Sequence, residues 1–292
     1  MSVKKAYDEL CFTDDFLFWK ILTSDTELCR EMLELLLDLK IREVRLAQGQ
    51  KAVDLTYDGR GVRFDVYVED ADNSVYDIEM QVKVEKQIPK RLRYYQGMID
   101  LNLLSSGKLY SELRKTYIIF ICLEDPFGLN LPIYHFRNMC QESPTLALAD
   151  EAEKVVINAA GKREGLSPRV ASFLDYIQGK AANSEFTNKL DVAVRDAREH
   201  KEWRLDYMSL LEKLRDEYDE GWAECSREKQ KEIDAANRKA DAANRLVDAA
   251  NRKVDAANKK ADAANRKIDA ANAEIARLRE ILRNYQGKPA QS

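Results

Sequence analysis

The sequence predicts an α/β core followed by an all-helical section and a heptad-repeat coiled coil. Three observations support this fold class. Residues 41–85 contain three segments with strand signals, and in two of them apolar and polar side chains alternate with the period of two that is typical of β-strands. Residues 116–125, "TYIIFICLED", form an apolar run of strand length, which predicts a central strand covered on both faces. Residues 234–272 repeat the motif D-A-A-N six times at a spacing of seven.

Two short helices are predicted near the N-terminus. Residues 12–22, "FTDDFLFWKIL", are expected to form the first helix, with Thr13 at its N-cap. Residues 24–39 are expected to form the second, because Ser24 and Glu27 have the spacing of a capping box. These helices precede the first predicted strand.

The remaining core elements alternate between strands and helices. A helix is predicted after Pro89, from Lys90 to about Ser105, and another begins with Ser167 as its cap and ends at Gly179. The turn-forming sequence "DADNS" joins the second and third predicted strands. In chain order the predicted strands are residues 41–48, 61–70, 74–85, 116–125 and 153–160.

Composition excludes several classes of protein. No apolar run reaches the roughly 18 residues of a membrane helix, and the N-terminus lacks the apolar segment of a secretory signal, so we expect a cytoplasmic location and no membrane partner. The five cysteines are widely spaced without a C-x-x-C pair, and there are only two histidines. A bound metal would therefore need oxygen ligands, which favours a hard cation such as Mg²⁺.

A local basic segment follows the third predicted strand. The net charge of −4 argues against nucleic-acid binding over the whole surface, but it allows a basic groove. A solvated helix face is the alternative interpretation of the same charges. The candidate DNA-binding residues of this segment are Lys86, Lys90, Arg91 and Arg93.

Acidic side chains are predicted to face each other across a hairpin. In "DIEMQVKVE", residues 77–85, every second residue is apolar, which predicts a half-buried strand with a polar face. If the hairpin is symmetric about Asp72, Asp65 lies opposite Glu79. Facing carboxylates destabilise a strand pair unless something compensates, and a divalent cation is the simplest compensation.

Such a pair suits phosphodiester hydrolysis. A bound metal ion polarises a phosphoryl oxygen and lowers the pKa of a coordinated water. On the same predicted face, Gln81 could contact the attacking water and Lys83 could stabilise phosphate charge. The alternative is a solvated hairpin face whose acids pair with Arg63, Lys83 or Arg93.

Ordered motifs add a family resemblance. Residues 64–81, "FDVYVEDADNSVYDIEMQ", and residues 89–128, from "PKRLRYYQ" to "LEDPFG", resemble the PD-(D/E)XK nuclease family transposases, also called recombination-promoting nucleases. The resemblance extends over roughly residues 10 to 225. It implies a restriction-endonuclease-like mixed sheet flanked by helices, with DNA as partner and Mg²⁺, or Mn²⁺ in its place, as cofactor.

The resemblance also implies roles for particular residues. Asp65 and Glu79 would hold the metal, and Gln81 stands where the wider superfamily has its catalytic lysine. Lys83 is our candidate to replace that lysine. Asp15 matches an acidic residue of the family's N-terminal segment and is a third candidate metal contact; the alternative is an Asp favoured by the helix dipole in a first helical turn.

The D-A-A-N repeats predict a coiled coil over residues 231–285. With Ile233 at position a, the seam has aliphatic residues at a and mostly alanine at d, while Asn occupies e and Lys mostly g. In five of the six copies the Asp precedes Arg or Lys by four positions, which supports a single helix. We expect a homo-oligomer through this tract; a lone solvated helix is the alternative.

Together these features predict three parts and one leading function. The parts are a nuclease-like core over residues 1–160, a helical extension over 161–230 and the coiled coil over 231–285. The expected function is a metal-dependent DNA endonuclease linked to recombination, mobile elements or phage defence. The alternative is a catalytically weak or inactive DNA-binding protein whose coiled coil mediates self-assembly or partner binding.

Overall fold

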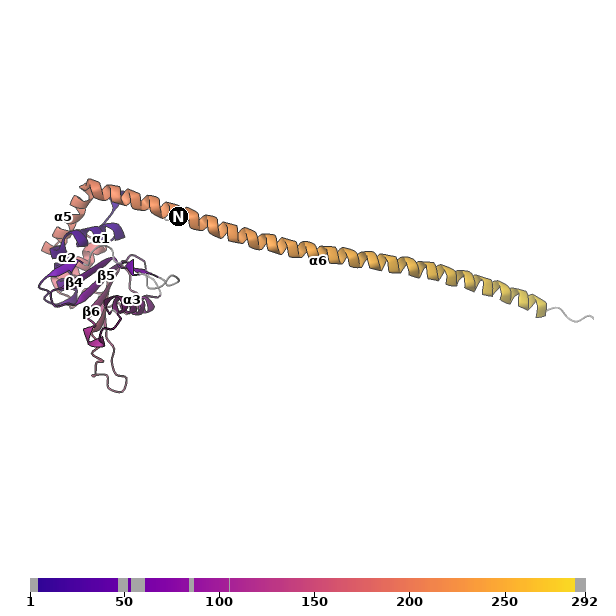
Figure 1. Ribbon diagram of the computed structural model, residues 1–292, viewed down its shortest axis with the longest axis horizontal. Helices are drawn as coiled ribbons and strands as arrows, with labels where there is room; N and C mark the ends of the chain where they lie inside the picture. The colour runs from indigo at the N-terminus through magenta and orange to yellow at the C-terminus, as the bar shows by residue number, and fades with distance from the viewer. Residues whose placement is uncertain (1–4, 47–51, 54–60, 84–86, 105, 287–292) are drawn as a thin grey trace, which may run out of the picture. The chain divides into compact units, whose positions relative to one another are not determined.

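The computed structural model describes residues 5–46, 52–53, 61–83, 87–104 and 106–286. The chain divides into two compact units, residues 1–210 and residues 211–292. The first unit contains the β-sheet, and the second consists of the greater part of one long helix (Figure 1). The division into three parts predicted from the sequence stays a prediction. Among the described helices, none has the length and apolar character needed to cross a bilayer.

A six-stranded mixed sheet forms the centre of the first unit. Strand β5 lies between β4, to which it is antiparallel, and β6, to which it is parallel. A separate two-stranded sheet pairs β2 (Ala52–Val53) with β3 (Val62–Arg63). The order of the large sheet is β1 (Val44–Leu46), β4 (Val66–Asp70), β5 (Val75–Gln81), β6 (Thr116–Cys122), β8 (Ala152–Asn158) and β7 (Ile133–Phe136).

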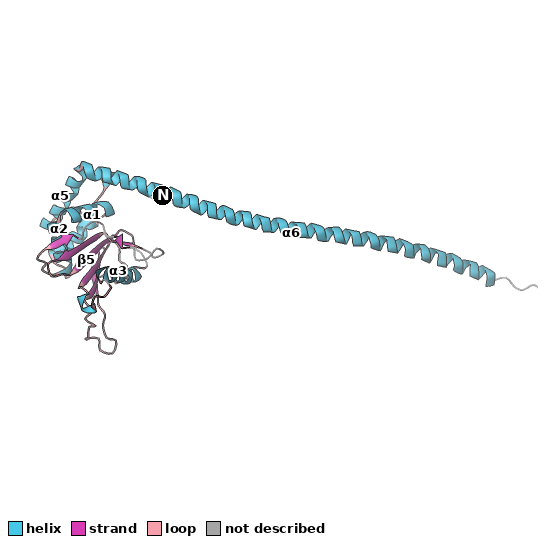
Figure 2. Cartoon of the chain, viewed as in Figure 1, coloured by secondary structure: helices cyan, strands magenta, loops and turns pink. Residues whose placement is uncertain are grey.

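Helices cover both faces of this sheet (Figure 2). On one face lies α3 (Ile88–Leu103), the crossover that joins β5 to the parallel strand β6. On the other face α1 (Asp15–Ser24) contacts β4, α2 (Thr26–Leu37) contacts β1, and α4 (Pro168–Ile177) and α5 (Glu185–Glu199) pack on these helices. The apolar core between α3 and the sheet includes Ile88, Leu92 and Ile99 of the helix, together with Phe64, Tyr67 and Phe120.

The prediction of a doubly covered central strand at residues 116–125 is confirmed. All seven residues of β6 are buried, and parallel strands border it on both sides. The predicted strand at 153–160 corresponds to β8, and the α4 helix has the predicted cap, since Ser167 accepts a hydrogen bond from the Val170 amide. The edge strand β7 was not predicted, because only four residues pair there and two of them are exposed.

Both predicted N-caps of the first two helices are wrong by one residue. Asp14, not Thr13, precedes α1, and its carboxylate accepts a hydrogen bond from the Cys11 amide instead of capping the helix. Asp25, not Ser24, caps α2 by accepting from the Leu28 amide. Ser24 is the last residue of α1, so the two helices follow each other more closely than the capping-box spacing suggested.

The predicted strand at 61–70 is divided in two. Residues 62–63 belong to β3 and pair with β2, whereas residues 66–70 belong to β4 in the large sheet. Phe64 and Asp65 connect the two strands outside either ladder. This break leaves Asp65 directly before β4, where its backbone amide donates a hydrogen bond to the Glu79 side chain.

Helix α6 (Lys201–Gln286) contains the whole D-A-A-N tract without interruption (Figure 1). At about 1.5 Å per residue, such a helix is roughly 130 Å long. The structure therefore supports the predicted long helix through residues 231–285. The association of this helix into a coiled coil stays a prediction.

Candidate active site

The observed hairpin has the register that the sequence predicts. Val66 pairs with Ile78 and Tyr67 pairs with Asp77, and the turn at residues 71–74 connects the strands. Continuing this register by one residue places Asp65 opposite Glu79. The side chains confirm the proximity: the Asp65 amide donates to Glu79 Oε1 at 3.0 Å, and the Met80 amide donates to Asp65 Oδ2 at 3.2 Å.

The polar face of β5 is buried, so the prediction of a half-buried strand is wrong. The exposed fraction of the residue is 2% for Glu79, 9% for Gln81 and 0% for Asp77. The reason is topological: β4 and β6 flank β5, while α3 folds back over the face that the sequence pattern leaves polar. A solvated hairpin face is therefore excluded for Glu79. Carboxylates in this position lose their hydration, which is costly unless they are paired or protonated.

Burial perturbs the acidity of the two facing carboxyls. Burial raises the pKa of Asp65 to about 6, and the charge of Asp15 adds to this effect. Burial raises the pKa of Glu79 to about 8, with repulsion from Asp65 as the second cause. Hydrogen bonds from the backbone amides act in the opposite direction, since they favour the charged forms. A positive charge close to these two carboxyls would therefore stabilise their ionised forms.

A third carboxyl lies deeper on the same face. Asp77 precedes Glu79 by two residues on β5, and neither of its buried oxygens has a hydrogen-bond partner in the described part of the chain. Burial and the charge of Glu79 raise its pKa well above the ordinary range of an aspartate. Asp77 is not among the site residues predicted from the sequence, because its burial depends on the position of α3.

Helix α3 supplies a cation and a hydroxyl to the acidic pair. Arg91 Nη2 lies 3.6 Å from Glu79 Oε2, and the Arg91 guanidinium also donates to the Gln81 side-chain oxygen. One turn further, the Tyr95 hydroxyl donates to Glu79 Oε2 at 3.1 Å and accepts from Arg91 at 3.2 Å. The arginine is further held over the ring of Phe120, with its central carbon 5.1 Å from the ring centroid.

Tyr95 contributes both to the apolar core and to the carboxylate site. Its ring packs on Phe64 and Phe120, as a core residue would, but its hydroxyl reaches Glu79. The i, i+4 spacing of Arg91 and Tyr95 places both on one helix face, and this spacing is the sequence signal that could have identified the pair. Tyr94, by contrast, is largely exposed.

The other predicted site residues are distributed around this centre. Lys83 is exposed in the bend that follows β5, and Lys90 and Arg93 are exposed on α3. Asp15 is the first residue of α1, and its charge acts on Asp65. Lys86 lies outside the described residues. The DNA-binding roles of these basic residues and the metal contact of Asp15 stay predictions.

The donor set fits a hard divalent cation. Asp65 and Glu79 offer carboxylate oxygens from adjacent positions, and a nearby cation would offset the costs of burial and repulsion that raise both pKa values. Within the described ranges, no group of three or more Asp, Glu, His or Cys side chains is arranged to hold a metal ion. The two facing carboxylates are accordingly the candidate ligands, and the remaining coordination positions would be filled by water or substrate.

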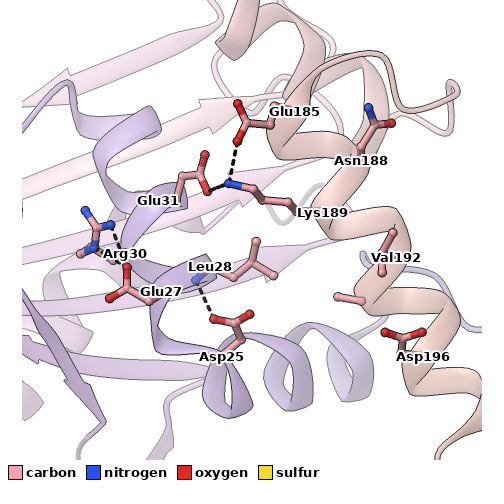
Figure 3. Close-up of a pocket in the computed structure, with 11 residues that line it drawn as sticks. Asp25, Glu27, Leu28, Arg30, Glu31, Glu185, Asn188, Lys189, Val192 and Asp196 are labelled. Atoms are coloured by element: carbon pink, nitrogen blue, oxygen red, sulfur yellow. Dashed lines mark hydrogen bonds and ion pairs between the residues drawn. The ribbon is translucent and has the colours of Figure 1, made fainter.

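A groove of about 740 Å³ lies elsewhere, between α2 and α5 (Figure 3). It contains none of the residues of the carboxylate site. Lys189 in its wall binds Glu31 and Glu185 at 3.0 Å each, and Asp25 is occupied as the cap of α2. Its lining has five carboxylates against two basic side chains, which disfavours DNA there. The carboxylates are Asp25, Glu27, Glu31, Glu185 and Asp196, and the bases are Arg30 and Lys189.

Comparison with known families agrees with the resemblance derived from the sequence. Residues 12–150 match the family model described as PD-(D/E)XK nuclease family transposase. The matched segment extends from α1 to the loop before β8, so it includes both facing carboxylates and α3. It ends well before residue 225, the expected limit of the resemblance. No curated protein and no solved structure matches the chain.

Proposed function

We propose that this protein, whose residues 12–150 match the PD-(D/E)XK nuclease family transposases, is a metal-dependent DNA endonuclease. The observation that best supports this function is the buried, facing pair of Asp65 and Glu79. A structural hairpin gains nothing from two carboxylates that repel each other in a desolvated position. A metal-dependent hydrolase needs both.

In this proposal Asp65 and Glu79 hold Mg²⁺, which Mn²⁺ can replace, and the ion supplies Lewis acidity toward the phosphate and its attacking water. The protein's own contribution is positioning. The backbone amides of Asp65 and Met80 fix one oxygen of each carboxylate, and Tyr95 orients the second oxygen of Glu79. Asp15, at the start of α1, is proposed as a further contact to the ion or its water.

The Gln81 side chain has its carboxamide oxygen bonded and its nitrogen available. Because its oxygen accepts from Arg91, its amide nitrogen is left to donate a hydrogen bond to a phosphate or a water. An amide carries no positive charge, so another residue must balance the charge that develops on the phosphate. Lys83 is one candidate, and Arg91, which already contacts both Gln81 and Glu79, is the other.

Substitution of the two cations distinguishes these roles. We expect Arg91→Lys to lower kcat for DNA cleavage by about 10²-fold, because a lysine cannot contact Gln81, Glu79 and Tyr95 together. Lys83→Ala is expected to lower kcat by a similar factor only if Lys83 replaces the superfamily lysine. Single-turnover cleavage of a labelled duplex measures both, with exposed Arg93→Lys as the control for loss of a surface contact.

The alternative function is DNA binding without cleavage. It is favoured by Gln81 at the lysine position and by the engagement of Glu79 with Arg91 and Tyr95. Incubation of supercoiled plasmid with the full chain, in Mg²⁺, Mn²⁺ or EDTA, separates the two functions. Nicking or linearisation in either metal and none in EDTA supports the endonuclease, whereas a gel shift with intact plasmid in all three conditions contradicts it. Links to recombination, mobile elements or phage defence are part of this proposal through the family match alone.

We also propose that the chain self-associates through residues 231–285. Two nuclease sites in one assembly could cut both strands of a duplex. The support is the heptad seam on an uninterrupted helix.

A further inference from the structure

We infer that α6 pairs in parallel with α6 of a second copy of this chain, and that Glu274 of each copy faces Arg279 of the other. This inference goes beyond self-association, because it assigns the orientation of the two helices. It rests on three features: an exposed seam, the distribution of charge beside the seam, and one pair of opposite charges at its C-terminal end.

The first feature is an aliphatic seam that nothing in the described chain covers. The a positions Ile233, Val254 and Leu282 are 52%, 56% and 61% exposed. Aliphatic side chains that recur every seven residues favour burial against another helix, and β-branched residues at a are common in two-stranded coils. The other exposed aliphatic residues of the seam are Val247, Ile268, Ile275 and Leu278.

The second feature is the charge at position g. In an antiparallel pair, position g of one helix lies beside position g of its partner. With the repeats fully overlapped, Lys253 would face Lys260 on both sides of the seam, and Lys239 would face Glu274, so attractive and repulsive contacts would be equal in number. In a parallel pair, position g lies beside position e of the partner, five residues further along the chain. That position is Asn throughout the repeats, and Lys beside Asn carries no like-charge penalty. The lysines at g are Lys239, Lys253, Lys260 and Lys267.

The third feature is the pair that ends the tract. Glu274 occupies g in the heptad where the lysine series stops, and Arg279 occupies e five residues later, where the asparagine series stops. Neither side chain forms an ion pair in the part of the chain that the structure describes. Only the parallel arrangement places them beside each other, once on each side of the seam. The charge pattern thus changes at both positions in a complementary way.

A parallel pair has a consequence for the nuclease core. Each core precedes its helix in the chain, so both cores are attached to the same end of the helix pair. An antiparallel pair would attach them to opposite ends of a segment about 80 Å long. The value of adjacent cores for double-strand cutting depends on the proposed endonuclease function, but the helix orientation does not.

Charge reversal in the full chain tests the proposed contact. At low ionic strength, E274R should raise the Kd of the dimer about tenfold, because two attractive pairs become repulsive. The double variant E274R/R279E should return the Kd to within about threefold of the parent. The matched control is E280R, which makes the same charge change at the outward f position and should leave the Kd unchanged. Sedimentation equilibrium measures all four proteins. Equal effects of E274R and E280R, or no rescue by the double variant, would overturn the contact.

A cross-linking experiment tests the orientation independently of charge. In a chain whose accessible cysteines Cys11, Cys140 and Cys225 are changed to serine, Ala271→Cys at position d should form a disulfide-linked dimer under mild oxidation. Ala273→Cys, on the outer face of the same turn, should not. An antiparallel pair would place Ala271 far from its counterpart. Absence of the cross-link at 271, or a monomeric mass for the full chain, would reject the parallel dimer. Neither the dimer Kd nor the cross-link depends on DNA cleavage, so both tests of the dimer can fail or succeed independently of the endonuclease proposal.

Discussion

Glu79→Gln is expected to reduce Mg²⁺-dependent cleavage of supercoiled plasmid by about 10³-fold, and Asp65→Asn by a similar factor. Each substitution keeps the shape of the side chain but removes a negative charge that the metal needs, and a loss of several kcal/mol of transition-state stabilisation corresponds to this change in rate. The effect should appear mainly in kcat at saturating DNA, since neither side chain lies among the exposed basic residues proposed to bind phosphate.

The matched control for these variants is Glu69→Gln. Glu69 lies on the same hairpin and pairs with Arg114 at 3.0 Å. Its substitution makes the same chemical change without touching the candidate ligands, so cleavage should remain within about twofold of the parent. Circular dichroism verifies that all three variants are folded. If Glu79→Gln and Asp65→Asn cleave as fast as Glu69→Gln, this pair of carboxylates is not the active site.

The second large effect is a loss of stability with rising pH when no metal is present. In EDTA, the free energy of unfolding should fall between about pH 5 and 8. Burial raises the pKa of Glu79 from its ordinary value to about 8, so the folded chain binds a proton there that the unfolded chain has released. The contribution of Glu79 to the free energy of unfolding is fully present below the pKa that this carboxyl has in the unfolded chain. It is lost as the pH rises toward the pKa in the folded chain, at up to about 1.4 kcal/mol per pH unit.

Thermal unfolding in EDTA at a series of pH values measures this dependence. Asp65, with a pKa raised to about 6, should contribute in the lower part of the same range. Glu79→Gln should make the slope shallower, because an amide does not titrate, while Asp65 and Asp77, whose pKa values burial also raises, should keep part of it. Millimolar Mg²⁺ should raise the melting temperature of the parent most at pH 8. A melting temperature independent of pH in EDTA would contradict the raised pKa values of these buried carboxyls.

The sequence predicted the relation between the two acids but not their environment. A period of two and a symmetric turn were sufficient to place Asp65 opposite Glu79, because hairpin register is determined by local chain geometry. Burial of the same face depends on how α3, the next element after β5, folds back over the sheet. Alternation alone indicates only that one face of the strand is apolar and the other polar. Asp77 was missed for this reason.

The same distinction explains the other differences. The long α6 helix and the buried β6 strand follow from strong periodicity over many residues, and both were predicted. The hydroxyl contact of Tyr95 with Glu79 depends on how α3 crosses the sheet, which a helical pattern does not specify. Several polar residues precede α1 and α2, and the sequence does not determine which of them takes the N-cap position. In the structure these residues are Asp14 and Asp25. Local patterns therefore predicted the elements, while tertiary contacts decided the chemistry of the site.

Calorimetric titration of the metal-free full chain with Mn²⁺ at pH 7 tests the central claim most directly. We predict one ion bound per chain, with proton release into the buffer, because the pKa of Glu79 is about 8 before the ion binds. Glu79→Gln should abolish this binding, and Glu69→Gln should preserve it. Equal Mn²⁺ binding by the parent and by Glu79→Gln, or no binding by the parent, would contradict a shared metal site between Asp65 and Glu79.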